Sequence, residues 1–81
     1  MTKLLLFGTQ GCHLCELAEE LIEAFQANEL GLLIERIDIA EHEQWQKIYA
    51  IRIPVLLNQE TGKELGWPFD YSDLEKLIAT K

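Results

Sequence analysis

The feature that most constrains the fold is a short apolar segment that changes abruptly into a helical pattern. Lys3 to Phe7 is almost entirely apolar and is broken at Gly8. Such a run predicts a central strand that is buried on both faces of a sheet. From Cys12 to about Asn28 the apolar residues recur at helical spacing. They are Leu14, Ala18, Leu21, Ile22 and Phe25. The sequence therefore predicts a buried strand followed directly by an amphipathic helix.

The rest of the chain continues this alternation and ends in a hairpin and a helix. A strand, a short helix and two hairpin strands are predicted, in that order, at residues 32–39, 41–49, 53–57 and 63–67. We expect the short helix to bury Trp45, Ile48 and Tyr49. Asp70 or Ser72 can cap a last helix that runs to about Ala79.

The order of these elements, β-α-β-α-β-β-α, indicates an α/β fold. A strand–helix–strand unit places its two strands parallel, through a right-handed crossover. The terminal hairpin adds two antiparallel strands. We therefore expect a four-stranded mixed sheet flanked by helices on both faces. The sequence has no repeat and no linker-like tract, so residues 1–81 are expected to form a single domain.

The charge of the chain excludes some classes of partner. Fourteen acidic and seven basic residues give a net charge of −7. Binding to nucleic acid or to anionic lipid depends on basic residues, so neither partner is expected. The apolar run after Lys3 is too short for a signal peptide core or a membrane span. We therefore expect a cytoplasmic protein that acts as a monomer.

The two cysteines, Cys12 and Cys15, lie where the first strand passes into the helix. In a reducing compartment such a pair is more typical of catalysis or metal binding than of a structural cross-link. Free amide groups and the helix dipole favour a thiolate at the first turn, and hence at Cys12. Cys15 should be more buried. The pair thus predicts thiol–disulfide exchange, in which Cys12 attacks a disulfide and Cys15 resolves the intermediate.

Three segments carry a resemblance to a known family: FGTQGCHLC (residues 7–15), RIPVL (52–56) and GWPFD (66–70). They resemble the glutaredoxin branch of the thioredoxin fold, and most closely the small bacterial glutaredoxin-like proteins of largely unassigned function. The resemblance implies a thioredoxin-like fold over the whole chain. It also implies a cis Pro54 that faces the cysteine pair. The backbone of Ile53 would pair with the substrate, and Arg52 is a further candidate for the substrate site.

The predicted activity is that of a glutaredoxin-like dithiol–disulfide oxidoreductase, acting on disulfides of proteins or small molecules. No bound cofactor is needed, because the cysteine pair itself holds the electrons. The electron donor stays open between glutathione and a thioredoxin reductase system. Glutathione-using relatives commonly have a threonine at the position of Arg52. The helix behind the site is also acidic, which disfavours an anionic ligand. Glutathione is therefore left as an open co-substrate.

Several alternatives remain open from the sequence. His13 is either a cation that stabilises the Cys12 thiolate or a solvated side chain of the first helical turn. A structural zinc site needs four ligands, and besides the cysteines the chain offers only His13 and His42, so no metal is predicted. A redox-inert binding module of the same fold is the alternative function. In that case the acidic helix face and the proline loop would dock a partner.

Overall fold

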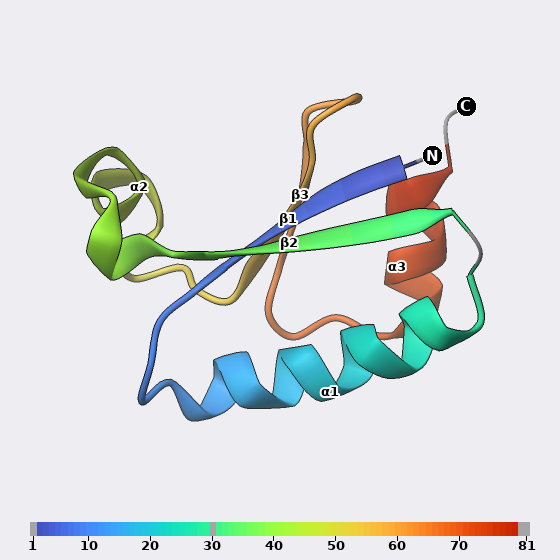
Figure 1. Ribbon diagram of the computed structural model, residues 1–81, viewed down its shortest axis with the longest axis horizontal. Helices are drawn as coiled ribbons and strands as arrows, with labels where there is room; N and C mark the ends of the chain where they lie inside the picture. Colours follow the sequence, from blue (N-terminus) through green and yellow to red (C-terminus); the bar gives the residue numbers. More distant parts are fainter. Residues whose placement is uncertain (1, 30, 80–81) are drawn as a thin grey trace.

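A computed structural model describes residues 2–29 and 31–79 of the chain (Figure 1). The elements follow one another as β1 (Thr2–Gly8), α1 (His13–Ala27), β2 (Leu32–Asp38), the 3-10 turn η1 (Ile39–Glu41), α2 (Glu43–Tyr49), β3 (Val55–Asn58), β4 (Lys63–Gly66) and α3 (Tyr71–Ile78). The expected order of strands and helices is confirmed. The predicted helix 41–49 begins later, at Glu43, and η1 precedes it from Ile39, the last residue of the predicted strand 32–39.

The four strands form one mixed sheet in the order β2-β1-β3-β4. β1 pairs in parallel with β2 and antiparallel with β3, and β3 and β4 form the antiparallel hairpin. This confirms the expected sheet. In the register, Phe7 lies opposite Val55. Gly8 and Pro54 are the next residues outward from this pair, so they lie at the same end of the sheet.

The core consists of two apolar layers, one on each face of the sheet. Successive side chains of a strand point to opposite faces. Leu4 and Leu6 accordingly belong to the layer covered by α1 and α3, and Leu5 and Phe7 to the layer that contains Tyr49 of α2. Figure 1 shows α1 and α3 below and to the right of the strands, and α2 at the left. Burial of β1 on both faces is confirmed. None of the described helices is long and apolar enough to cross a membrane.

Two local expectations are wrong, and one open choice is resolved. Leu14 is 46% exposed, because Cys15 takes the inward position in the first turn of α1. Ile48 is 50% exposed, because the adjacent Tyr49 takes the inward position of α2. Of the two candidate caps of α3, Asp70 is the one used. Its side chain accepts the backbone N–H of Asp73 and forms a capping box.

Asn58 is fully buried at the end of β3 and supports a stability prediction. Its amide Nδ2 donates to the carbonyl of Leu77 at 2.8 Å, and its Oδ1 accepts the N–H of Glu60 at 3.0 Å. Asn58→Ala should lower the free energy of unfolding by about 1–3 kcal/mol, because it leaves the buried carbonyl of Leu77 without this donor and removes the bond to Glu60. Equilibrium denaturation measures this loss. The exposed neighbour Gln59 is the control, and an equal loss in Gln59→Ala would contradict the assignment.

Candidate functional site

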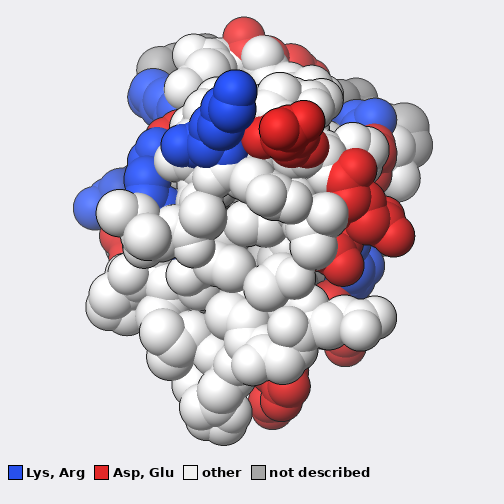
Figure 2. All heavy atoms as spheres, turned by 90° about the vertical axis from the view of Figure 1, so that its left-hand side faces the viewer, with Lys and Arg blue, Asp and Glu red and all other residues white. Residues whose placement is uncertain are grey.

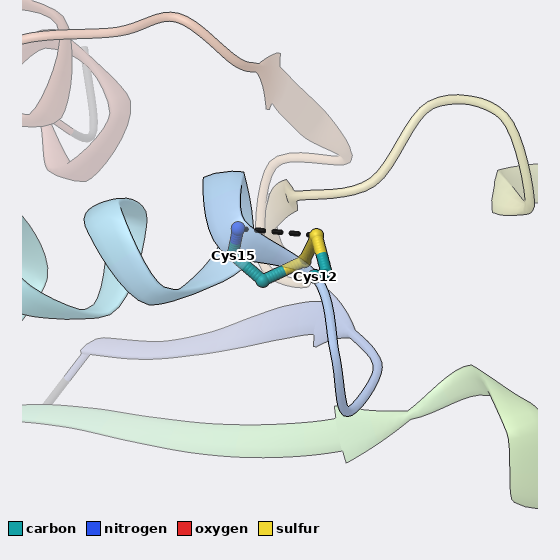
Figure 3. The surroundings of a disulfide bond; sticks show 2 residues. All are labelled: Cys12 and Cys15. Carbon is teal, nitrogen blue, oxygen red and sulfur yellow. Dashed lines mark hydrogen bonds between the residues drawn. A yellow bond between two sulfur atoms is a disulfide. The ribbon is translucent and has the colours of Figure 1, made fainter.

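The two cysteines lie at the start of α1, at the end of the sheet where β1 finishes (Figure 3). They are joined in a disulfide whose Cα atoms are 5.2 Å apart. Cys12 is the N-cap residue, with extended backbone angles, and Cys15 lies in the first turn. Cys15 is only 6% exposed, whereas Cys12 is half-buried. The expected difference in burial between the two cysteines is therefore confirmed.

The sulfur of Cys12 caps the helix. The backbone N–H of Cys15 donates to Cys12 Sγ at 3.1 Å, as the dashed line in Figure 3 shows. A serine or aspartate oxygen occupies this position at many helix starts. The positive end of the helix dipole and this N–H both favour negative charge on the capping atom. The arrangement can therefore hold a thiolate at Cys12 once the disulfide is opened.

Gly8, the last residue of β1, contacts the second cysteine. A Cβ added at Gly8 would lie 3.1 Å from Sγ of Cys15 and 3.4 Å from its Cβ. The missing side chain therefore lets the strand pass close beside the Cys15 sulfur. Sequence reasoning treated Gly8 only as the end of a strand. A glycine within a strand often marks a close approach of another group, and that signal could have revealed the contact.

Pro54 and Ile53 come to the same end of the sheet as the cysteines. The Ile53–Pro54 peptide bond is cis, as expected, and Pro54 is buried directly before β3. The N–H of Ile53 donates to the carbonyl of Tyr49 at 3.1 Å. No donor within residues 2–29 and 31–79 reaches the Ile53 carbonyl. The carbonyl of Ile53 is therefore available to pair with a substrate backbone. The N–H of Ile53 is not, because it already donates to Tyr49.

Arg52 is held by two groups of the protein itself. Its Nη2 lies 2.6 Å from Oε1 of Glu64 on β4, and its guanidinium lies 5.2 Å from the centre of the Tyr49 ring. The Tyr49 hydroxyl donates to the other oxygen of Glu64 at 2.5 Å. Burial, together with this carboxylate, raises the pKa of Tyr49 to about 12. The group fastens the segment before Pro54 to β4, and it partly neutralises the charge of Arg52.

This group makes stability depend on pH. Hydrogen bonds from Tyr49 and Arg52 hold the pKa of Glu64 below its ordinary value of 4.5. The carboxylate therefore stabilises the fold above that value, and its contribution is lost as the pH falls through the lowered pKa. We expect the gap in unfolding free energy between wild type and Glu64→Gln to shrink from about pH 6 to about pH 3. Denaturation at both pH values measures it. Glu60→Gln, in the exposed hairpin turn, should show no such change, and a constant gap for Glu64→Gln would contradict the prediction.

The His13 side chain makes no contact that would assign it to the site, and the described residues form no metal site. His13 is the first residue of α1 and is exposed, and its side chain makes no hydrogen bond or ion pair with any described part of the chain. Its influence on Cys12 stays a prediction. Within the described ranges, no group of three or more His, Cys, Asp or Glu side chains is arranged to hold a metal ion.

A pocket of about 470 Å³ lies beside the cysteines, between the start of α1 and the end of β2. Its lining includes Gly8, Cys15 and Glu16, together with Arg36 and Asp38 of β2. β2 and β3 flank β1 on opposite sides, so this pocket is on the side of β1 away from Pro54. Sequence reasoning missed it, because residues far apart in the chain form its walls.

Comparison with known proteins finds one matching family model and several similar solved structures. The model of the glutaredoxin-like domain (DUF836) matches residues 3–79. A solved structure of protein XcR50 from X. campestris is 32% identical, covers 90% of this chain and 91% of its own, and has a TM-score of 0.73. Protein Ne2328 from Nitrosomonas europaea is 29% identical over 96% of this chain and 92% of its own, with a TM-score of 0.79. No curated protein matches.

A more distant match identifies the fold class. A mutant thioredoxin from Halobacterium salinarum has a TM-score of 0.71 at 24% identity, over 95% of this chain and 71% of its own. The fold is thus thioredoxin-like, as expected. A close cysteine pair at the start of the first helix of such a fold fits a redox role.

Proposed function

Because this chain belongs to the glutaredoxin-like domain family, we propose that it is a thiol–disulfide oxidoreductase that reduces disulfides in protein substrates. The observation that carries the proposal is the hydrogen bond from the Cys15 N–H to the sulfur of Cys12. It stands at the N-terminus of a 15-residue helix, where a thiolate is stabilised over a thiol. Disulfide exchange requires a reactive thiolate that a substrate can reach and a second thiol close to it. Cys12 is half-buried and Cys15 lies next to it in the first turn of α1.

The reaction proceeds in two exchanges of sulfur partners. The Cys12 thiolate attacks one sulfur of the substrate disulfide, forms a mixed disulfide and releases the other substrate sulfur as a thiolate. Cys15 then loses its proton and attacks the sulfur of Cys12. The bond between Cys12 and the substrate breaks, the second substrate thiolate leaves, and the Cys12–Cys15 disulfide closes. Two electrons pass to the substrate, and an external donor must reduce the pair again.

The surface around the site supports a protein substrate. Figure 2 views the end of the molecule that carries the cysteine loop and the segment before β3. The middle of this face lacks acidic and basic side chains, which gather at its edges. Three exposed apolar side chains belong to the segments at this end: Leu14, Ile48 and Ile51, the last 99% exposed. Apolar contact area of this kind suits a protein surface, whereas a small anionic thiol would need a free cation, and Arg52 is already paired with Glu64.

Two assays test the activity and the donor separately. Oxidised protein is offered glutathione in one arm and thioredoxin reductase with NADPH in the other, and mass spectrometry after alkylation counts the thiols formed. The reduced protein is then mixed with a disulfide-bonded protein such as insulin. The proposal expects a reversible gain of two protons and reduction of the protein disulfide.

Each outcome has a defined meaning. Reduction by the reductase alone would exclude glutathione as the donor and leave the chemistry intact. If the two-proton change never occurs, the oxidoreductase assignment fails and the binding-module alternative is favoured. The cytoplasmic setting and the monomeric state remain predictions from the sequence.

A further inference from the structure

The second exchange step requires that Cys15 lose a proton, because only a thiolate attacks a disulfide. Cys15 is 6% exposed, so little of its side chain touches bulk solvent. Cys12 and the substrate occupy the side from which the mixed disulfide forms. The proton therefore needs another route and an acceptor.

The pocket between α1 and β2 provides the route. Gly8 and Cys15 both line it, and the missing side chain of Gly8 leaves open the space directly beside Sγ of Cys15. A Cβ at this position would stand 3.1 Å from that sulfur. The pocket, at about 470 Å³, is far larger than the roughly 30 Å³ that one water molecule occupies in the liquid. The pocket is thus large enough for water, and it borders Cys15 from the side of β1 away from Pro54.

The titratable side chains that line the pocket besides Cys15 are Glu16, Glu19, Arg36 and Asp38. Glu19 of α1 is ion-paired with Nε of Arg36 on β2. Asp38 caps η1, since its Oδ1 accepts the N–H of Ala40 at 2.9 Å. Glu16 makes no side-chain hydrogen bond or ion pair with the residues that the structure describes. Among the three carboxylates that line this pocket, Glu16 is thus the one without a hydrogen-bond or ion-pair partner in the described part of the chain.

We propose that Glu16 accepts the proton of Cys15 through the water of this pocket during the second exchange. The inference rests on the proposed function, because it concerns the resolving step. The S–H bond of Cys15 breaks and its proton passes to the carboxylate of Glu16. The sulfur of Cys15 bonds to the sulfur of Cys12, and the electron pair of the Cys12–substrate bond leaves with the substrate thiolate. Glu16 later returns the proton to solvent. The two cysteine sulfurs are oxidised to the disulfide and the two substrate sulfurs are reduced to thiolates, so protons and electrons both balance.

A two-phase absorbance experiment isolates this step. Reduced protein is mixed in a stopped-flow instrument with one equivalent of 5,5′-dithiobis(2-nitrobenzoate), whose thiolate is coloured. The first thiolate reports attack by Cys12 and the second reports attack by Cys15. In Glu16→Gln the second phase should slow about tenfold or more near neutral pH, with the first phase unchanged. The difference should vanish toward about pH 10, where a thiol ionises without help.

A purely electrostatic role for Glu16 predicts the opposite sign. Removal of a negative charge beside Cys15 would favour its thiolate and accelerate the second phase. Glu16→Asp keeps a carboxylate and should recover most of the rate. Glu19→Gln removes the same charge from the same pocket and is the matched control. It should not slow the second phase.

The possible results separate this inference from the proposed function. An unchanged or faster second phase in Glu16→Gln, or equal slowing in Glu19→Gln, would overturn the role of Glu16 alone. A wild-type protein that releases the first thiolate but never the second, even at high pH, would instead contradict the proposed function, and the inference would fall with it.

Discussion

Cys12→Ser is expected to reduce the turnover of protein disulfides to the background rate. A serine hydroxyl is not ionised near neutral pH and cannot replace the thiolate that attacks the substrate. Serine is nevertheless a favourable N-cap residue, so α1 should still begin at His13. The loss of activity would therefore report chemistry and not misfolding.

The measurement is the steady-state reduction of a protein disulfide with an excess of electron donor. Reduced wild-type protein is the reference for stability, because both samples then lack the Cys12–Cys15 bond. We expect the two unfolding free energies to agree within about 1 kcal/mol. Substantial turnover by Cys12→Ser at unchanged stability would show that Cys12 is not the attacking group.

Cys15→Ser is expected to stop the reaction after the first exchange and to accumulate protein joined to its substrate. Cys12 keeps its position at the helix start and can still attack. The residue behind it can no longer complete the second exchange. Non-reducing gels should show the mixed disulfide, and mass spectrometry should locate it on Cys12.

The double variant Cys12→Ser/Cys15→Ser is the control and should form no adduct. If Cys15→Ser loses turnover but traps no adduct with any disulfide offered, the two cysteines do not have the assigned roles. Turnover by Cys15→Ser with glutathione present would indicate that glutathione releases the substrate instead, which would make the second cysteine dispensable for that donor.

The elements that the sequence predicted well are those with strong local patterns. The apolar run of β1 is short and ends at Gly8, which favours a strand buried on both faces over a helix segment. Asp70 was one of two caps predicted for α3, and the structure selects it over Ser72 through a capping box with Asp73. The cis peptide bond at Pro54 was predicted through a resemblance, and the structure confirms it.

The features that sequence reasoning missed depend on contacts between distant segments. Leu14 and Cys15 both lie close to the apolar stripe of α1, and in the structure Cys15 faces inward, where Gly8 of β1 passes close to its sulfur. The group of Arg52, Tyr49 and Glu64 joins the segment after α2 to an edge strand. The hydrophobic pattern of one helix or strand carries no information on which distant residue a side chain will contact. The contacts of Arg52 could therefore not be predicted from the sequence.

The two segments that form the site differ in how firmly the sheet holds them. The cysteine loop follows β1, a central strand, whereas the segment before Pro54 lies between α2 and β3. The loop that carries Cys12 leaves a strand with hydrogen-bonded neighbours on both sides, and such strands open only with large-scale unfolding. Residues 50–53 lie outside the sheet. The ion pair of Arg52 with Glu64 joins them to β4, and their backbone N–H groups at Arg52 and Ile53 bond to Tyr49 of α2. Local opening should therefore require less free energy there. Substitutions in this segment can change the preferred partner while the spacing of the redox pair stays constant, so specificity can evolve separately from chemistry.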